Sequence, residues 1–231
     1  MHRLILINGY PGVGKRTVAE ELCKRIPNSK VVDHRKLLLP FSEVIDPKNH
    51  AEFNHLRQTI RRQYLASIVT SLCHHNTTWI CTEFIPTTSY GYSAVTEYQR
   101  AAHHAGLKFA VVNLNCEYTE NWCRLNKDGR MYVPTEDDLQ QWEKARMASS
   151  LLGYNELSLR PYLIEFNITN ISPEEASEKI FDRIGKCTEP SIQLSPLSSC
   201  ADLFSSENVP IRGYIHAYID EDNNGNHSVT V

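Results

Sequence analysis

The sequence lacks any long uninterrupted apolar segment, although 41% of its 231 residues are hydrophobic. No stretch approaches the about 18 consecutive apolar residues that a membrane-spanning helix requires. The apolar run nearest the N-terminus, residues 4–7, is too short for a signal peptide. We therefore expect a cytoplasmic protein, with the nucleus as the alternative compartment, and no membrane partner.

Cysteine pairs at metal-binding or redox spacing are also lacking. The seven cysteines are an odd number, lie far apart and include no Cys-x-x-Cys pair. This distribution is typical of reduced thiols, and it argues against a disulfide framework or a zinc site. The histidine pairs at 74–75 and 103–104 have no third ligand at metal spacing, which favours surface positions over a metal role.

An excess of positive charge is lacking as well. The 24 Lys and Arg residues face 27 Asp and Glu residues, and the formal net charge is −3. A surface for general nucleic-acid binding would be basic, so this balance argues against that function but not against a local basic pocket. The sequence has no internal repeats, and it carries no signal for an oligomeric state.

What the sequence does have is an alternation of short apolar runs with longer segments of helical periodicity. Continuous apolar runs predict buried strands, over residues 4–7, 31–32, 79–82, 109–114 and 162–166. Apolar residues that recur every three or four positions predict helices, over about 18–26, 51–75, 94–105, 117–125, 135–153 and 173–185. This order predicts an α/β fold with a parallel sheet and helices on both faces.

The composition changes near residue 187. Residues 191–208 are rich in Ser and Pro, which is typical of a linker. The apolar run 214–219 predicts one further strand, and the acidic, amide-rich residues 220–226 predict a turn or disorder. We therefore predict a domain over 1–186 and a tail over 187–231 that is partly disordered or adds one strand.

The strongest chemical motif follows the first predicted strand. Residues 9–17 read Gly-Tyr-Pro-Gly-Val-Gly-Lys-Arg-Thr, which is the G-x-x-x-x-G-K pattern of a phosphate-binding loop between a strand and a helix. Glycines let backbone N–H groups turn inward around an anion, and the helix adds its positive end. Lys15 supplies a mobile cation for the β- and γ-phosphates. The predicted nucleotide-binding residues are Gly9, Gly12, Val13, Gly14, Lys15, Arg16 and Thr17.

One position departs from the loop of many nucleotide hydrolases. Those enzymes place the Ser or Thr that holds magnesium directly after the lysine, where this chain has Arg16. The hydroxyl comes one residue later, at Thr17. A nucleotide-binding regulatory protein or a weak NTPase without acceptor kinase activity is therefore an alternative to a kinase. A non-enzymatic protein whose tail docks a partner is a third interpretation.

The run at 9–17 resembles the G-x-P-G-x-G-K-x-T loop of the P-loop nucleoside-monophosphate kinases and related small-molecule kinases. It is still more similar to uncharacterised adenylate-kinase-like proteins with G-Y-P-G-x-G-K-x-T-x-A, and the resemblance covers about residues 1–186. It implies a three-layer P-loop NTPase fold with a five-stranded parallel sheet in the order 2-3-1-4-5. It also implies transfer of the γ-phosphoryl group of ATP to a small molecule or nucleotide, with Mg²⁺ as cofactor.

Acidic residues follow two of the predicted strands, and ligands bind outside the carboxyl ends of parallel strands. Asp33 is our candidate for a base or positioner of the acceptor, with capping of the next helix as the alternative. Arg35 beside it is a candidate acceptor contact. Glu83 resembles the Walker B position, where Asp is usual, and we predict that Thr17 and Glu83 place magnesium.

Two arginines lie four residues apart in the predicted 51–75 helix. Arg57 and Arg61 therefore share a face of that helix. Guanidinium groups bind phosphates and carboxylates through paired hydrogen bonds, so we predict that both arginines bind the acceptor. A solvated, charged helix face is the alternative.

Two further arginines, Arg124 and Arg130, flank the polar loop 126–130. The resembling kinases have a mobile lid at this place, and its arginines reach the transferred phosphoryl group. We therefore include both arginines with Lys15 and Asp33 among the predicted catalytic residues, with a basic surface turn as the alternative. Residues 167–170 lie where the resembling family has its adenine-binding segment.

Overall fold

The computed structural model describes residues 2–41, 43–45, 50–70, 76–86, 89–125 and 163–186, together with the isolated residues 137, 140, 144 and 204. The predicted loop 126–130 lies outside the described residues, as do most of the predicted 135–153 helix and of the predicted tail. The chain divides into one unit of Met1–Ile192 and another of Gln193–Val231. The boundary at residue 186 stays a prediction.

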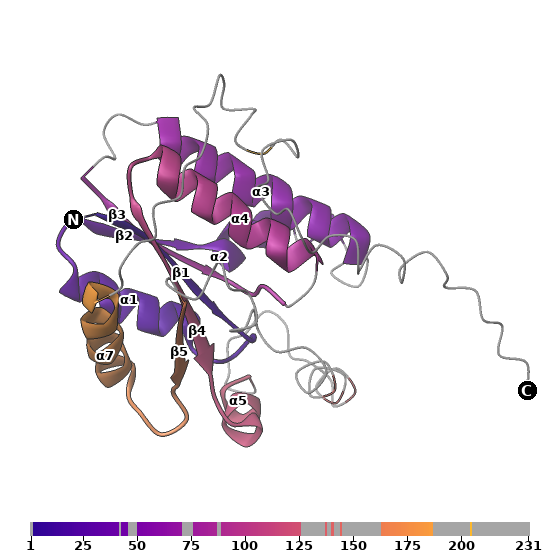
Figure 1. The fold of residues 1–231 in the computed structure, drawn as a ribbon. Helices are drawn as coiled ribbons and strands as arrows, with labels where there is room; N and C mark the ends of the chain where they lie inside the picture. Colours follow the sequence, from indigo (N-terminus) through magenta and orange to yellow (C-terminus); the bar gives the residue numbers. More distant parts are fainter. Residues whose placement is uncertain are drawn as a thin grey trace, which may run out of the picture. The chain divides into compact units, whose positions relative to one another are not determined.

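The centre of the first unit is a five-stranded, all-parallel sheet (Figure 1). Its strands are β1 (Arg3–Gly9), β2 (Ser29–Asp33), β3 (Thr78–Glu83), β4 (Lys108–Asn115) and β5 (Leu163–Asn167). The order across the sheet is β2-β3-β1-β4-β5, and the predicted fold class is confirmed. Strand β3 is buried along its whole length, and β1 is buried after its first residue, which explains their continuous apolar runs.

Helices cover both faces of this sheet (Figure 1). The pair α1 (Lys15–Arg25) and α7 (Pro173–Lys186) packs together on one face, and the pair α3 (His50–Thr70) and α4 (Ser89–His104) packs on the other. Helix α5 (Tyr118–Leu125) follows β4 as predicted. Two short elements, α2 (His34–Leu38) and the 3₁₀ turn η1 (Leu39–Phe41), were not predicted. Among the described residues, no helix combines the length and hydropathy needed to cross a membrane.

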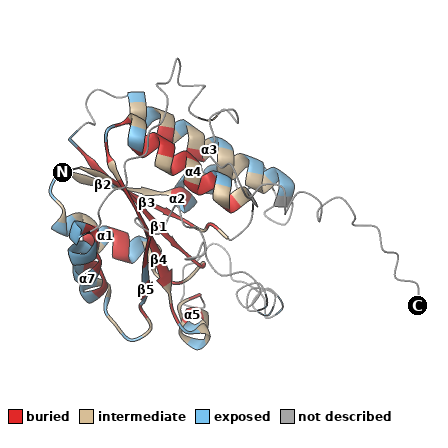
Figure 2. Cartoon of the chain, viewed as in Figure 1, coloured by how far each residue is buried: buried red, intermediate tan, exposed pale blue. Residues whose placement is uncertain are grey.

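The main apolar core lies between the sheet and the α1–α7 pair. Helix α1 turns Val18, Ala19 and Leu22 toward the strands, and burial is concentrated in the sheet and on the inner helix faces (Figure 2). Helix α7 begins where Ser172 Oγ accepts a hydrogen bond of 3.1 Å from the backbone N–H of Glu175, as the capping pattern predicts. Apolar periodicity thus accounts for both helices on this face, and the capping pattern accounts for the start of α7.

A buried asparagine, Asn8, fixes the carboxyl end of β1, where the glycine-rich loop begins. Its Oδ1 accepts hydrogen bonds of 2.8 Å from the backbone N–H groups of Gly9 and of Ile85. Its Nδ2 donates to the carbonyl of Ile85 at 3.0 Å and to Asn113 Oδ1 at 3.1 Å. One side chain therefore ties together the ends of β1, β3 and β4.

We expect the substitution Asn8→Ala to lower the free energy of unfolding by about 3 kcal/mol, because it leaves buried polar groups of three strands without partners. Urea denaturation followed by circular dichroism measures this loss. The control is Asn167→Ala, since Asn167 is exposed and, among the described residues, its side chain bonds to Thr169 of its own turn alone. A loss no larger than that of the control would contradict a clamping role for Asn8.

Candidate functional site

The glycine-rich loop connects β1 to α1 and has the backbone shape that phosphate binding requires. Gly12 and Gly14 have φ angles of 85° and 105°, in the region that favours glycine. A Cβ atom at Gly12 would lie 2.5 Å from Leu125 and 2.6 Å from Asn121, so α5 packs directly against the loop. No side chain caps the N-terminus of α1, and its first N–H groups face the loop.

Lys15, the first residue of α1, folds back over the loop. Its Nζ donates hydrogen bonds to the carbonyls of Gly9 at 2.7 Å and Tyr10 at 2.9 Å. Thr17 is exposed in the first turn of the helix. Arg16 is exposed too, and its Nε lies 2.7 Å from Glu20. The loop therefore places an ammonium group and a hydroxyl group at the start of one helix.

The guanidinium of Arg124, on α5, connects the loop with the segment after β5. Its Nη1 donates to the carbonyl of Val13 at 2.8 Å, and its Nη2 donates to the carbonyl of Ile168 at 3.1 Å. Its Nε is held by Glu120 at 2.7 Å. The structure thus brings Arg124 to the loop, whereas Arg130 lies outside the described residues.

Asp33 ends β2 and caps the short helix α2. Its Oδ1 accepts hydrogen bonds from the backbone N–H of Arg35 at 3.1 Å and from Thr82 Oγ1 at 3.2 Å. Its Oδ2 lies 3.7 Å from Arg16 Nε. The helix cap that the sequence left as an alternative is present, and the second oxygen of Asp33 faces the loop. The side chain of Arg35 is exposed.

Glu83, at the end of β3, is the centre of a buried charge network. Its Oε1 lies 2.8 Å from Arg61 Nη1, 3.2 Å from Arg57 Nη2 and 3.0 Å from His34 Nδ1. Its Oε2 accepts a hydrogen bond of 2.8 Å from the hydroxyl of Tyr98. Both oxygens of Glu83 are therefore already bound by protein donors.

A second buried carboxylate, Glu97 on α4, extends this network. Its Oε2 accepts from Arg61 Nε at 2.7 Å, and its Oε1 pairs with Arg62 Nε at 2.7 Å. Arg61 is completely buried between the two carboxylates, whereas the side chain of Arg57 is 11% exposed and also donates to the Phe84 carbonyl. The shared face of Arg57 and Arg61 thus points inward, toward Glu83.

Three members of the network, His34, Glu97 and Tyr98, were missed by the sequence analysis. One signal for Glu97 is its spacing, because it lies three residues after the buried Ala94 and four before the buried Ala101. A charged residue in such an apolar stripe indicates a buried ion pair. Tyr98 fits the same apolar stripe, four residues after Ala94 and three before Ala101, whereas His34 leaves no comparable pattern.

The network changes the acidity of its members. Burial by itself would raise the pKa of the Glu83 carboxyl, but His34, Arg61 and Arg57 hold that pKa well below its ordinary value. Burial, reinforced by the charge of Glu83, raises the pKa of Tyr98 well above its ordinary value. Glu83 therefore stays charged and Tyr98 stays protonated, which matches the hydrogen bond between them.

Comparisons with known proteins place this geometry in context. Residues 5–143 match the family model AAA_18, described as AAA domain. No curated protein sequence matches the chain.

Solved structures share the fold at low sequence identity. A thymidylate kinase from Candida albicans has a TM-score of 0.53 at 15% identity, over 80% of this chain and 92% of that one. A shikimate kinase from Acinetobacter baumannii has a TM-score of 0.52 at 14% identity, over 80% of this chain and 94% of that one. A tunicamycin resistance protein from Deinococcus radiodurans has a TM-score of 0.50 at 19% identity, over 80% of this chain and 96% of that one. These likenesses establish the fold.

We expect Glu83→Gln to lower the free energy of unfolding by about 3 kcal/mol, because it removes one of the two carboxylates that compensate the buried charge of Arg61 and the only carboxylate that pairs with Arg57 among the described residues. The control Glu175→Gln removes an exposed ion pair with Lys179 and should change stability by less than about 0.5 kcal/mol. Urea denaturation at pH 7 measures both.

The pH dependence provides a second measurement on the same variants. The pKa of Glu83 is lower in the folded chain than its value of about 4.3 when unfolded, so its stabilising contribution is complete above that value and is lost as the pH falls below it. The wild type should therefore lose stability between pH 5 and pH 3 more steeply than Glu83→Gln. Parallel pH profiles would contradict a charged, buried Glu83.

Proposed function

The chain belongs to the AAA domain family, and on that premise we propose that it is an ATP-dependent phosphotransferase of the adenylate-kinase-like type. It would move the γ-phosphoryl group to a small molecule or nucleotide, with Mg²⁺ as cofactor, in the cytoplasm. The observation that carries the proposal is the loop geometry, in which Gly12 and Gly14 have positive φ angles and the ammonium of Lys15 folds back over the loop. The thymidylate and shikimate kinases that share this fold support it.

The loop would stabilise the negative charge of the transferred group. Backbone N–H groups and the N-terminus of α1 bind phosphate oxygens, and the Lys15 ammonium exchanges its bonds to Gly9 and Tyr10 for bonds to phosphate. Arg124, which already contacts the loop, and Arg130 of the predicted lid would neutralise charge that develops during transfer. A closing lid also excludes water, which limits simple hydrolysis of ATP.

Thr17 fits a magnesium site, because its hydroxyl is exposed two residues after Lys15 and Mg²⁺ prefers oxygen ligands. Magnesium bound there would offset charge on the β- and γ-phosphates. Glu83 fits this role poorly, since both of its oxygens already accept bonds from protein donors. We propose that Glu83 instead holds Arg57 in position at the acceptor side.

Asp33 and the network would receive the acceptor. The Oδ2 of Asp33 faces the loop and would orient the acceptor hydroxyl. As the hydroxyl oxygen attacks the γ-phosphorus and ADP leaves, Asp33 would take the proton of that hydroxyl. Arg57, together with Arg35, would bind an anionic group of the acceptor. The network supports this assignment, because it contains three guanidinium groups and two carboxylates. Arg61, which is fully buried, would act by supporting Arg57 through Glu83.

A second candidate is a nucleotide-binding regulatory protein or weak NTPase. It is favoured by the position of Arg16, whose guanidinium lies 3.7 Å from the carboxylate proposed as the base. An ion pair with Arg16 would occupy the Oδ2 atom of Asp33 that the acceptor hydroxyl needs. This candidate requires nucleotide binding without phosphorylation of any acceptor.

We expect Lys15→Ala to weaken ATP binding and to lower phosphoryl transfer by about 100-fold or more, because it removes the cation that contacts the transferred group. Calorimetry with ATP and a screen of metabolites with γ-labelled ATP measure the two effects. The control is Lys24→Ala, since Lys24 lies on the same helix and pairs with Glu21. Equal ATP affinities of wild type and Lys15→Ala would overturn the proposal.

We expect Asp33→Asn to lower transfer to the acceptor by about 100-fold while ATP affinity stays unchanged. Asparagine retains an oxygen that caps α2 and accepts from Thr82, so the fold around it is preserved. Single-turnover transfer assays and ATP titrations measure the two quantities. Unchanged ATP turnover in Asp33→Asn, with no phosphorylated acceptor in the wild type, would favour the regulatory protein.

A further inference from the structure

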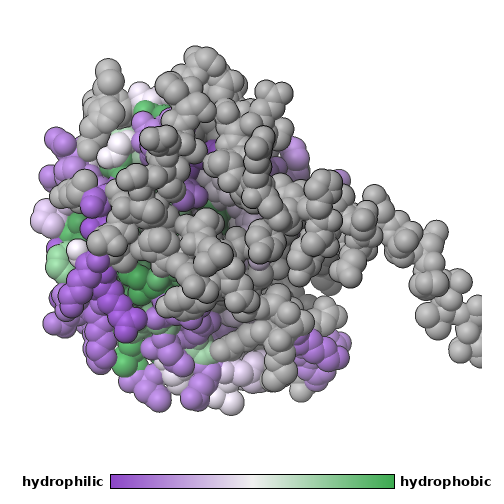
Figure 3. Space-filling model, in the orientation of Figure 1, coloured by the Kyte–Doolittle hydropathy of each residue, from purple (hydrophilic) through white to green (hydrophobic). Residues whose placement is uncertain are grey.

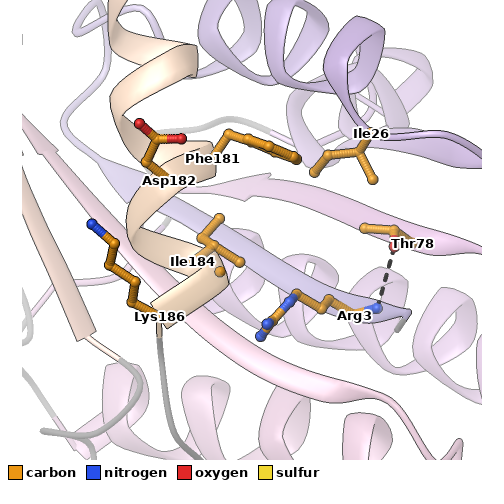
Figure 4. A pocket seen from close by; sticks show the side chains of 8 residues that line it. Arg3, Ile26, Thr78, Phe181, Asp182, Ile184 and Lys186 are labelled. Atoms are coloured by element: carbon orange, nitrogen blue, oxygen red, sulfur yellow. Dashed lines mark hydrogen bonds between the residues drawn. The ribbon is translucent and has the colours of Figure 1, made fainter.

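A cavity of about 310 Å³ lies between the end of α1, the last turns of α7 and the first residues of β1 and β3 (Figure 4). Its apolar lining comes from Ile26, Phe181 and Ile184, and its polar lining includes Arg3 and Thr78. Around α1 and α7 the described surface is mostly hydrophilic, with smaller hydrophobic areas (Figure 3). We call this cavity the α1–α7 pocket.

The α1–α7 pocket is separate from the nucleotide loop. Arg3 and Thr78 are the first residues of β1 and β3, whereas the loop follows the carboxyl end of β1. Strand β1 has seven residues, which at about 3.3 Å each separate the two places by about 20 Å. A ligand in the pocket therefore does not occupy the phosphate position.

Arg3 brings an unsatisfied buried nitrogen to the pocket. Its backbone N–H donates to Thr78 Oγ1 at 3.3 Å, but its side-chain Nη1 is buried and has no hydrogen-bond partner among the described residues. A buried donor without an acceptor destabilises the folded state, and the effect is larger for a charged group. An anion bound in the pocket would remove this cost.

The other charged groups of the pocket do not replace that anion. Asp182 and Lys186 lie four residues apart on α7, and in Figure 4 the ends of both side chains point away from the Arg3 guanidinium. The wall opposite Arg3 is apolar, because Phe181 and Ile26 face each other across the cavity (Figure 4). Phe181 is 44% exposed, so part of its ring is accessible to a ligand.

We propose that the α1–α7 pocket binds a small organic carboxylate with an apolar body. The carboxylate accepts from Arg3 Nη1, and the hydrocarbon part packs between Phe181, Ile26 and Ile184. Burial of the apolar wall and pairing of the guanidinium both favour such a ligand. The cavity is at the small end of ligand-binding pockets, which fits a single aromatic ring or a short branched chain. The inference does not depend on the proposed function.

The test uses the full chain and titrates 3-phenylpropionate, with the neutral 3-phenylpropan-1-ol as the matched probe. We expect saturable binding of the acid by the wild type, and binding at least about tenfold weaker for the alcohol and for Arg3→Gln. Phe181→Ala, which keeps the charge, should also weaken binding of the acid. Lys179→Gln, on the exposed side of α7 and outside the pocket, is the control and should bind like the wild type.

Failure of the wild type to bind the acid, or equal binding by Arg3→Gln, would overturn the proposal. Urea unfolding of each variant checks the fold. If Arg3→Gln does not fold, Phe181→Ala replaces it, and binding of the acid as tight as that of the wild type would then overturn the proposal. A parallel titration with ATP locates the probe, because the two ligands should bind independently. Competition between the acid and ATP would place the acid in the nucleotide loop and also overturn the proposal.

Discussion

The buried ion pair between Glu83 and Arg61 is the interaction on which the proposed acceptor side of the molecule depends. The two groups are 2.8 Å apart and essentially inaccessible to solvent, so each has lost its hydration. Further hydrogen bonds to Glu83 and Arg61 offset much of the cost of burying this pair. Tyr98 and His34 bind Glu83, and Glu97 binds Arg61, so the pair joins β3, α2, α3 and α4. A position that resembles a magnesium ligand in the sequence is, in the structure, a structural centre.

The nucleotide loop depends on the same end of the sheet. Asn8 pairs in register with Glu83 across β1 and β3, so the residue that clamps the loop and the residue that organises the network are neighbours. Asn8 acts through neutral hydrogen bonds at the start of the loop. Glu83 acts through its charge, which holds the arginines of the proposed acceptor side. A change at either residue is therefore expected to move the loop and the acceptor side relative to each other.

The sequence predicted the features whose pattern lies within one segment or recurs at a regular spacing. The nine-residue loop and the long helices have patterns within a single element, and the strand order came from the resemblance that the loop carries. Helix α2 was missed because its five residues are too short to show a helical period. The shared face of Arg57 and Arg61 was predicted, but periodicity alone does not say whether that face points outward. The buried Leu65, four residues after Arg61, was the available signal.

The partners of Glu83 could not be predicted because they come from elements far apart in the chain. The same limit applies to the α1–α7 pocket, whose walls belong to the two ends of the described domain. Unsatisfied buried nitrogen atoms give a physical criterion that patterns lack. Among the described residues, Nη2 of Arg61 and Nε2 of His34 are such atoms on the acceptor side, and Nη1 of Arg3 is one in the pocket. Each end of the sheet thus holds a buried guanidinium nitrogen without an acceptor among the described residues, and we expect each place to favour an anionic ligand.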